Sequence, residues 1–186
     1  THTFDELKTL FTLSQSVATQ YQATWGKALL IESLQRGSAI QMEWIEAVKM
    51  TPDPKGHFLC ALGTFRLWKY KETLKILIPL WPRMRESRDV KILLALTLNR
   101  CRKHRAADQL LWTLIKSGHD IDEKAVLLSI TISNCIHSGN EDKARQIVLD
   151  YEAELIKSKL YGYFLRNSAT LFQGETANSY WEKSIT

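Results

Sequence analysis

The chain has 186 residues, of which 45% are hydrophobic and 24% are charged, which is the composition of a globular protein with a sizeable core. It contains no run of about 18 apolar residues, so the sequence predicts no membrane-spanning helix. The formal net charge of +5 is concentrated between residues 66 and 105, where 12 basic and 3 acidic residues occur, and this predicts a basic surface suited to an acidic partner.

Apolar residues recur at helical spacing along the whole chain. The first predicted helix covers residues 1–22 and places Phe4, Leu7, Leu10 and Phe11 on one face. The remaining predicted helices cover residues 24–35, 38–50, 57–68, 71–78, 88–101, 105–116, 124–137, 141–149, 152–157, 160–172 and 175–184. Because no alternation of apolar and polar residues is sustained, the sequence predicts an all-α fold.

The predicted helices pair as hairpins, and the segment 124–149 is the clearest pair. It is interrupted at Ser138, Gly139 and Asn140. Gly139 ends the first helix because glycine readily adopts the left-handed conformation that closes a helix. Glu141 follows, and its carboxylate suits the positive end of the next helix. The stop and start signals therefore predict two helices joined by a short turn.

The hairpin recurs along the chain. A small or apolar residue near the start of each second helix returns at intervals of 34, 33, 37 and 35 residues. These residues are Ile40, Leu74, Ala107, Ala144 and Ser179. A single hairpin of this length cannot bury its apolar face alone, so we expect neighbouring hairpins to stack on one another.

Two stretches resemble the tetratricopeptide repeat: WIEAVKMTPDP (Trp44–Pro54) and WKYKETLKILIPLWP (Trp68–Pro82). Residues 107–148 are also similar to the related pentatricopeptide family, with SG-x-D between units and SGNEDKA at the turn. The resemblance implies a right-handed α-solenoid of about four to five repeats. Residues 24–186 would form the repeats of a single domain, 1–186, in which residues 1–22 are an N-terminal helix. An irregular helical bundle is the alternative.

In such a solenoid the first helix of each hairpin lines a concave groove, which the resemblance marks as the place where a partner binds. The candidate partner-binding residues combine inward positions of the register with the basic run after residue 99. They are Leu59, Arg66, Asn99, Arg100, Arg102, Lys103, Ser133 and His137. The register places Leu29, Glu32, Gly63 and Ser129 on the same face.

Motifs of known catalytic and phosphate-binding sites are absent from the sequence, and we expect neither an enzyme nor a bound cofactor. The pairs His57-x-x-Cys60 and Cys101-x-x-His104 each place two metal-binding residues on one helix face. The repeat register offsets the two pairs by about eight residues, or about 12 Å along a helix axis, which argues against a shared zinc ion. The cysteines, which include Cys135, are odd in number and indicate free thiols in a reducing, cytoplasmic compartment.

The sequence thus predicts a protein–protein interaction domain, such as an adaptor, scaffold or chaperone, that binds a peptide or helical segment. An RNA-binding repeat and a self-associating scaffold remain alternatives. Nucleic acid is disfavoured because Trp68, Tyr70 and Trp81 occupy positions that a repeat would use for its core. Trp68 and Trp181 fit the apolar stripes less well than the other tryptophans do.

Overall fold

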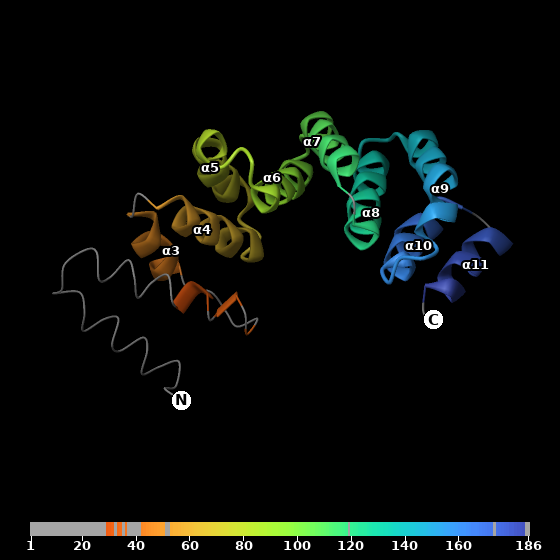
Figure 1. The fold of residues 1–186 in the computed structure, drawn as a ribbon, viewed down its shortest axis with the longest axis horizontal. Coiled ribbons are helices and arrows are strands. Elements are labelled where there is room, and N and C mark those ends of the chain that lie inside the picture. Colours follow the sequence, from red (N-terminus) through yellow and green to blue (C-terminus); the bar gives the residue numbers. More distant parts are fainter. Residues whose placement is uncertain are drawn as a thin grey trace. The chain divides into compact units, whose positions relative to one another are not determined.

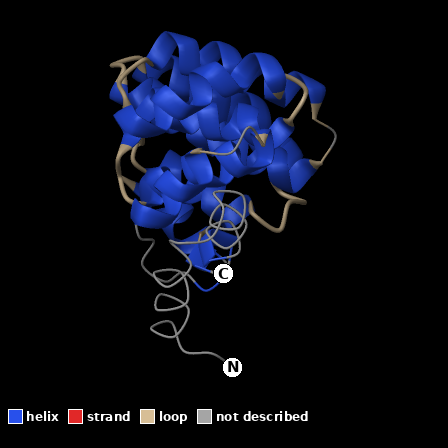
Figure 2. Ribbon diagram, turned by 90° about the vertical axis from the view of Figure 1, so that its left-hand side faces the viewer, coloured by secondary structure: helices blue, strands red, loops and turns tan. Residues whose placement is uncertain are grey.

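The computed structural model describes residues 29–31, 33, 34, 36, 42–50, 53–118, 120–172 and 174–184. The helix predicted over residues 1–22 and the register residue Ile40 lie outside the described residues. Within the described residues the chain forms helices and short connections and contains no strand (Figure 2). The prediction of an all-α fold is confirmed for this part of the chain.

The helices of the described residues occur in the predicted order along the chain (Figure 1). The elements are α3 (Met42–Lys49), α4 (Pro54–Arg66), α5 (Tyr70–Leu80), the 3-10 turn η2 (Trp81–Arg83), α6 (Arg88–Arg100), α7 (His104–Ser117), α8 (Ile121–His137), α9 (Glu141–Leu155), α10 (Tyr161–Ala169) and α11 (Glu175–Lys183). The separate helix predicted over 152–157 is wrong, because α9 continues without a break to Leu155. Asp53 and Asp120 cap α4 and α8 by accepting hydrogen bonds from backbone N–H groups of the first turn.

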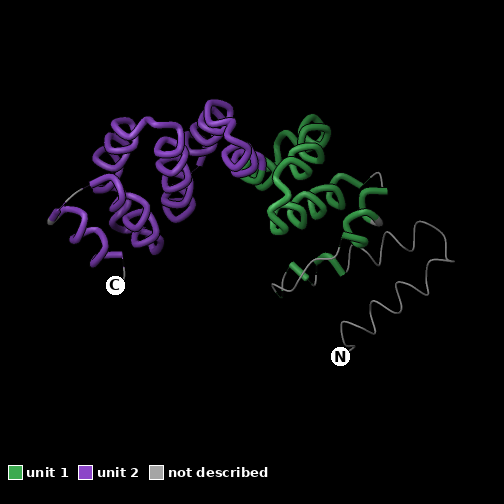
Figure 3. Tube along the Cα trace, turned by 180° about the vertical axis from the view of Figure 1, so that it is seen from behind, with its two compact units in different colours: residues 1–93 green, residues 94–186 purple. Residues whose placement is uncertain are grey.

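The backbone divides into two compact units, and the boundary between Leu93 and Leu94 falls inside α6 (Figure 3). We refer to residues 1–93 as the N-terminal unit and to residues 94–186 as the C-terminal unit. The prediction of one continuous repeat domain stays a prediction.

Three hairpins turn in the same way. The residue that closes the first helix has a left-handed backbone in each: Trp68 (φ 62°), Arg102 (φ 58°) and Gly139 (φ 75°). Each turn is also closed by a hydrogen bond that spans five residues, of the type that ends many helices. These bonds are Lys69 N to Thr64 O (3.0 Å), Lys103 N to Leu98 O (2.9 Å) and Asn140 N to Cys135 O (2.9 Å).

The turns correct the register read from the sequence. By their hydrogen bonds, Thr73 is equivalent to Ala107 and Ala144, so the choice of Leu74 was wrong by one residue. Thr73, Ala107 and Ala144 are all fully buried. The slip arose because the left-handed position of the first hairpin is Trp68, and nothing in a tryptophan signals that conformation. A left-handed backbone costs an ordinary L-residue about 1–2 kcal/mol, which glycine avoids.

The N-terminal unit has a core in which α3 packs on α4 and α4 on α5. Gly63, expected to line a groove, instead lies inside this core. A Cβ added there would come within 3.2 Å of Leu30 and 3.3 Å of Ile45, so the lack of a side chain allows the close approach. Leu29, also expected in the groove, is buried in the same cluster as Trp44.

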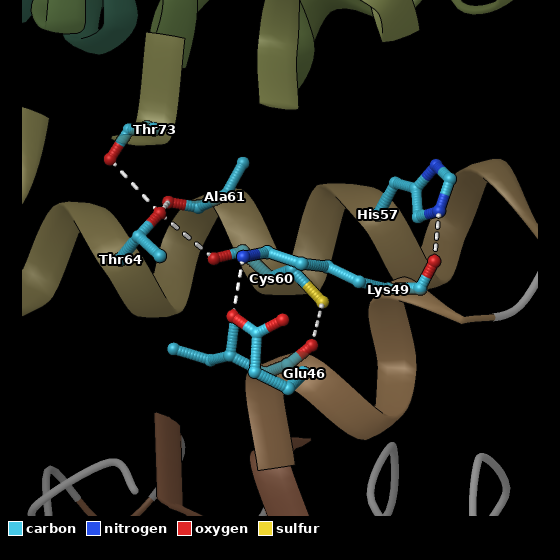
Figure 4. Close-up of polar contacts among 8 residues, drawn as sticks. Glu46, Lys49, His57, Cys60, Ala61, Thr64 and Thr73 are labelled. Carbon is cyan, nitrogen blue, oxygen red and sulfur yellow. Dashed lines mark hydrogen bonds and ion pairs between the residues drawn. The ribbon is translucent and has the colours of Figure 1, made fainter. Parts of the chain in front are cut away.

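A hydroxyl pair joins α4 to α5 inside this unit (Figure 4). Thr64 Oγ1 donates to the carbonyl oxygen of Cys60 or Ala61, each 3.0 Å away, and accepts a hydrogen bond from Thr73 Oγ1 at 3.0 Å. Both threonines are fully buried. Their hydroxyl groups are therefore satisfied without water, as burial of polar groups requires.

In the C-terminal unit neighbouring hairpins pack on one another. Helix α7 contacts α8, α10 contacts both α8 and α9, and α11 contacts α10 (Figure 1). Glu152 of α9 accepts hydrogen bonds from Tyr161 of α10 (3.1 Å) and Tyr180 of α11 (2.7 Å), so one carboxylate connects three helices. Asp122 of α8 accepts hydrogen bonds from the Ser158 hydroxyl (2.7 Å) and the Lys159 backbone N–H (2.8 Å), which connect α8 to the α9–α10 loop.

Searched over the described residues, the structure has no helix whose length and apolar character would suit a membrane span.

Candidate functional site

A groove of about 580 Å³ lies in the C-terminal unit. The first helices of three successive hairpins, α6, α8 and α10, supply most of its lining, and the α6–α7 turn and the first residue of α7 supply the rest. The lining residues are Leu96, Asn99, Arg100, Arg102, His104, Ser129, Ile130, Ser133, His137, Tyr163 and Asn167. We call it the α6–α8–α10 groove.

Equivalent positions of two hairpins line the groove. The offset of 37 residues between Arg102 and Gly139 relates Arg100 to His137 and Leu96 to Ser133. All four of these residues line the groove. The lining therefore follows from the hairpin geometry, because side chains four residues apart lie on one face of a helix.

Two arginines and two histidines give the groove its electrostatic character. Arg100, Arg102 and His137 are exposed and His104 is half-buried. Among the described residues that line the groove, none carries a carboxylate. Arginine guanidinium groups bind carboxylates and phosphates through paired hydrogen bonds, so this lining suits an anionic group.

Hydrogen bonds hold both imidazoles in one orientation. The Asn134 side chain, 2% exposed, donates from Nδ2 to the His104 carbonyl oxygen (3.0 Å), so its Oδ1 accepts from His104 Nδ1 (2.9 Å). His137 Nδ1 donates to the Ser133 carbonyl oxygen at 2.6 Å. In both residues Nδ1 carries the proton when the ring is neutral, which leaves Nε2 for other partners.

Ser133 and His137 do not form the nucleophile and base of a hydrolase. Ser133 Oγ lies 3.3 Å from His137 Nδ1, but that nitrogen holds its proton for the Ser133 carbonyl oxygen. A general base needs a free lone pair on the nitrogen that faces the hydroxyl.

Of the eight candidate partner-binding residues, the structure brings five together in this groove: Asn99, Arg100, Arg102, Ser133 and His137. Ser129, predicted on the same face, also lines it.

The other three candidates lie elsewhere. Lys103 is exposed in the α6–α7 turn but does not line the groove. Leu59 and Arg66 belong to α4 of the N-terminal unit, where Leu59 is half-buried. Arg66 Nη1 donates to the Leu34 carbonyl oxygen at 2.8 Å, a contact between residues 32 positions apart that sequence spacing could not reveal.

Sequence reasoning missed part of the lining, chiefly Tyr163 and Asn167 of α10. They are four residues apart, and Asn167 Nδ2 donates to the Tyr163 carbonyl oxygen at 3.2 Å. The spacing of these two polar residues along the predicted helix was the available signal. His104 was considered only as a metal ligand, and Leu96 precedes Arg100 by one turn on the same face.

The side chains of three of the four residues in the two His/Cys pairs, His57, Cys60 and His104, have other partners. Cys60 Sγ donates to the Ile45 carbonyl oxygen (3.3 Å), and His57 Nε2 donates to the Lys49 carbonyl oxygen (3.1 Å) (Figure 4). Burial raises the pKa of the Cys60 thiol to about 12, so the thiol stays protonated at neutral pH. Over the part of the chain that the structure describes, no three His, Cys, Asp or Glu residues are grouped to hold a metal ion.

A smaller pocket of about 380 Å³ lies between α7, the end of α8 and the start of α9. Its charged residues are Arg105, Asp108 and Lys143, of which Asp108 and Lys143 form a 2.7 Å ion pair. Cys135 also lines it, but burial raises the pKa of this thiol and so disfavours the reactive thiolate. The cysteines of the described residues are all free thiols, as the sequence predicted.

The described tryptophans differ in exposure, and Trp81 and Trp112 are half-buried. Trp44 is 1% exposed and belongs to the core, as predicted. Trp68 is 76% exposed, so its assignment to a core position was wrong, and Trp181 is 42% exposed. The turn explains the difference, because its left-handed backbone places Trp68 at the tip of the α4–α5 hairpin.

Comparison of the chain with models of known protein families, with curated proteins and with solved structures gives no match.

Proposed function

We propose that the chain is a tetratricopeptide-like helical repeat protein, an α-solenoid without catalytic activity, that binds an acidic segment of another protein in the α6–α8–α10 groove. The observation that carries the proposal is the lining itself. Three successive first helices supply it, and it contains two arginines, two histidines and no carboxylate among the described residues.

The repeat architecture is supported by the three turns of one geometry and by the packing of α10 on α8. In a solenoid, contact between corresponding helices of neighbouring repeats creates an extended surface. That surface is where helical repeat proteins are expected to bind extended or helical segments. The free thiols fit a reducing compartment such as the cytoplasm.

The size and chemistry of the groove fit a short segment of a partner. A volume of about 580 Å³ accommodates a few side chains. Leu96 and Ile130 provide apolar contacts beside the polar groups, and Tyr163 is 48% exposed. Arg100 and Arg102 would pair with carboxylates of the segment. The hydroxyl and amide groups of the groove lining would accept hydrogen bonds from the backbone of the segment and donate hydrogen bonds to it. An adaptor, a scaffold or a chaperone would use such a site in the same way.

Binding of a fluorescein-labelled, glutamate-rich peptide, followed by fluorescence anisotropy, tests this function. We expect saturable binding that weakens with salt, because exposed ion pairs are screened. The double variant Arg100→Glu/Arg102→Glu should bind about 10-fold or more weakly, since each reversed charge replaces attraction with repulsion. A lysine-rich peptide of equal length should not bind.

The matched control is Lys116→Glu/Lys157→Glu, which changes the net charge equally. Both lysines are exposed in the C-terminal unit and neither lines the groove. If the control weakens binding as much as the groove variant does, net charge and not the groove attracts the peptide, and the proposal fails.

A further inference from the structure

A second surface lies at the tip of the α4–α5 hairpin in the N-terminal unit. Trp68 is 76% exposed there, and its ring centroid is 6.3 Å from that of Tyr70, at an interplanar angle of 53°. Tyr70 is half-buried and packs in turn on Phe65, with a centroid distance of 5.2 Å. The outer ring is therefore presented to solvent on a base of aromatic side chains that holds it in place.

The turn itself does not require this tryptophan. The equivalent position is Arg102 in one hairpin and Gly139 in another, and all three turns have the same hydrogen bonds. Trp68 has φ 62°, a conformation that is strained for a bulky residue and unstrained for glycine. A large exposed side chain in a strained conformation that the fold does not need points to a role in binding.

Three lysines follow Trp68 within seven residues of the chain. Lys69, Lys71 and Lys75 are exposed, and none of them forms an ion pair with another described residue. Lys71 and Lys75 are one turn apart on α5 and share a face. Glu72 is the one acidic residue between positions 66 and 75, and it is half-buried.

We propose that this surface binds single-stranded nucleic acid, with one base stacked on Trp68 and the adjacent phosphates paired with Lys69, Lys71 and Lys75. An aromatic ring near positively charged side chains is the combination that binds single-stranded nucleic acid without sequence preference. A membrane surface is less well matched, because interfacial binding needs a broad apolar face and this tip exposes a single large ring. The site shares no residue with the α6–α8–α10 groove, so either proposal can fail alone.

Anisotropy titration of the full chain with fluorescein-labelled oligouridylate and with the deoxythymidine oligonucleotide tests the proposal. We expect binding at low salt with both probes, and a difference between them would show whether the ribose is read. The variant Trp68→Gly should bind roughly 5- to 150-fold more weakly, the loss associated with one stacked base. Because glycine relieves the left-handed strain, this variant should remain folded, with an unfolding midpoint in urea no lower than that of the wild type.

Two controls separate stacking from charge. Trp181→Ala removes another exposed tryptophan and should leave the affinity unchanged. Lys69→Gln/Lys71→Gln/Lys75→Gln should weaken binding and reduce the slope of log affinity against log salt by about 2, since each single-strand phosphate contact contributes about 0.7.

Three results would overturn the proposal: no binding of either oligonucleotide at low salt, equal affinity of Trp68→Gly and wild type, or loss of binding in Trp181→Ala as large as in Trp68→Gly. Binding of phosphatidylserine vesicles that depends on Trp68, without binding of oligonucleotides, would also overturn it and assign the surface to membranes.

Discussion

Replacing Glu152 should destabilise the C-terminal unit by removing the carboxylate that joins three helices. Glu152 accepts hydrogen bonds from Tyr161 (3.1 Å) and Tyr180 (2.7 Å), which belong to α10 and α11. A hydrogen bond to a charged group contributes about 1.5–3 kcal/mol. The Tyr180 bond should lie in this range because its residue is 7% exposed. The Tyr161 bond should contribute less, since it is longer and that residue is half-buried.

We therefore expect Glu152→Ala to lower the free energy of unfolding by about 2–4 kcal/mol, part of which is the cost of leaving the buried Tyr180 hydroxyl without a partner. Glu152→Gln keeps an oxygen that can accept one of the two hydrogen bonds. It should cost about 1 kcal/mol.

Urea unfolding followed by circular dichroism measures these changes, and hydrogen exchange of the α10 and α11 amides assigns them to the C-terminal unit. The double-mutant cycle with Tyr161→Phe/Tyr180→Phe is the decisive comparison. In that background Glu152→Ala should cost much less than in the wild type. Equal costs in both backgrounds would show that Glu152 acts through packing and would refute the reasoning.

Burial and the neighbouring Glu152 raise the pKa of Tyr161 to about 12 and the pKa of Tyr180 further. The stability that the two protonated tyrosines provide should therefore be complete below pH 10 and lost as pH rises through 12. The urea midpoint measured as a function of pH tests this. The hydrogen bond from Ser158 lowers the pKa of Asp122. The stability that the Asp122 carboxylate contributes should therefore be present above pH 3.8, the ordinary pKa, and lost as pH falls below it. Asp122→Asn should remove this part of the dependence of the urea midpoint on acid pH. Gly139→Ala should cost about 1 kcal/mol through its φ of +75° alone, because no atom beyond the two neighbouring residues lies within 4 Å of the added methyl group. An unchanged urea midpoint would contradict the left-handed turn.

Helices and hairpins were predictable because they depend on local spacing. The α8–α9 turn was read correctly from Gly139, a residue that favours the left-handed conformation. The α4–α5 turn was misread by one residue because Trp68 takes that conformation against its own preference. The packing of the hairpin imposes the left-handed conformation on Trp68. The identity of a single residue does not reveal such packing.

The groove was predictable where it follows the repeat. Arg100 and His137 occupy equivalent positions, so the register placed both on the inner face. Tyr163 was not predicted because α10 follows a longer loop after α9. The turn geometry shared by the α4–α5, α6–α7 and α8–α9 hairpins does not fix the register across that loop. Arg66 was assigned to the groove, although its guanidinium donates to the Leu34 carbonyl oxygen, a tertiary contact that no local pattern reports.

The central claim is that a protein partner occupies the α6–α8–α10 groove. Site-specific photo-crosslinking tests it most directly, with benzoylphenylalanine at position 163, inside the groove, or at position 181, outside it. Tyr163 and Trp181 are a matched pair, since both are aromatic residues of the C-terminal unit with exposures of 48% and 42%. The account predicts that position 163 alone gives a crosslink to an acidic segment of one partner, and that Arg100→Glu/Arg102→Glu abolishes it. Equal crosslinks at both positions, or a crosslink that survives the charge reversal, would contradict it.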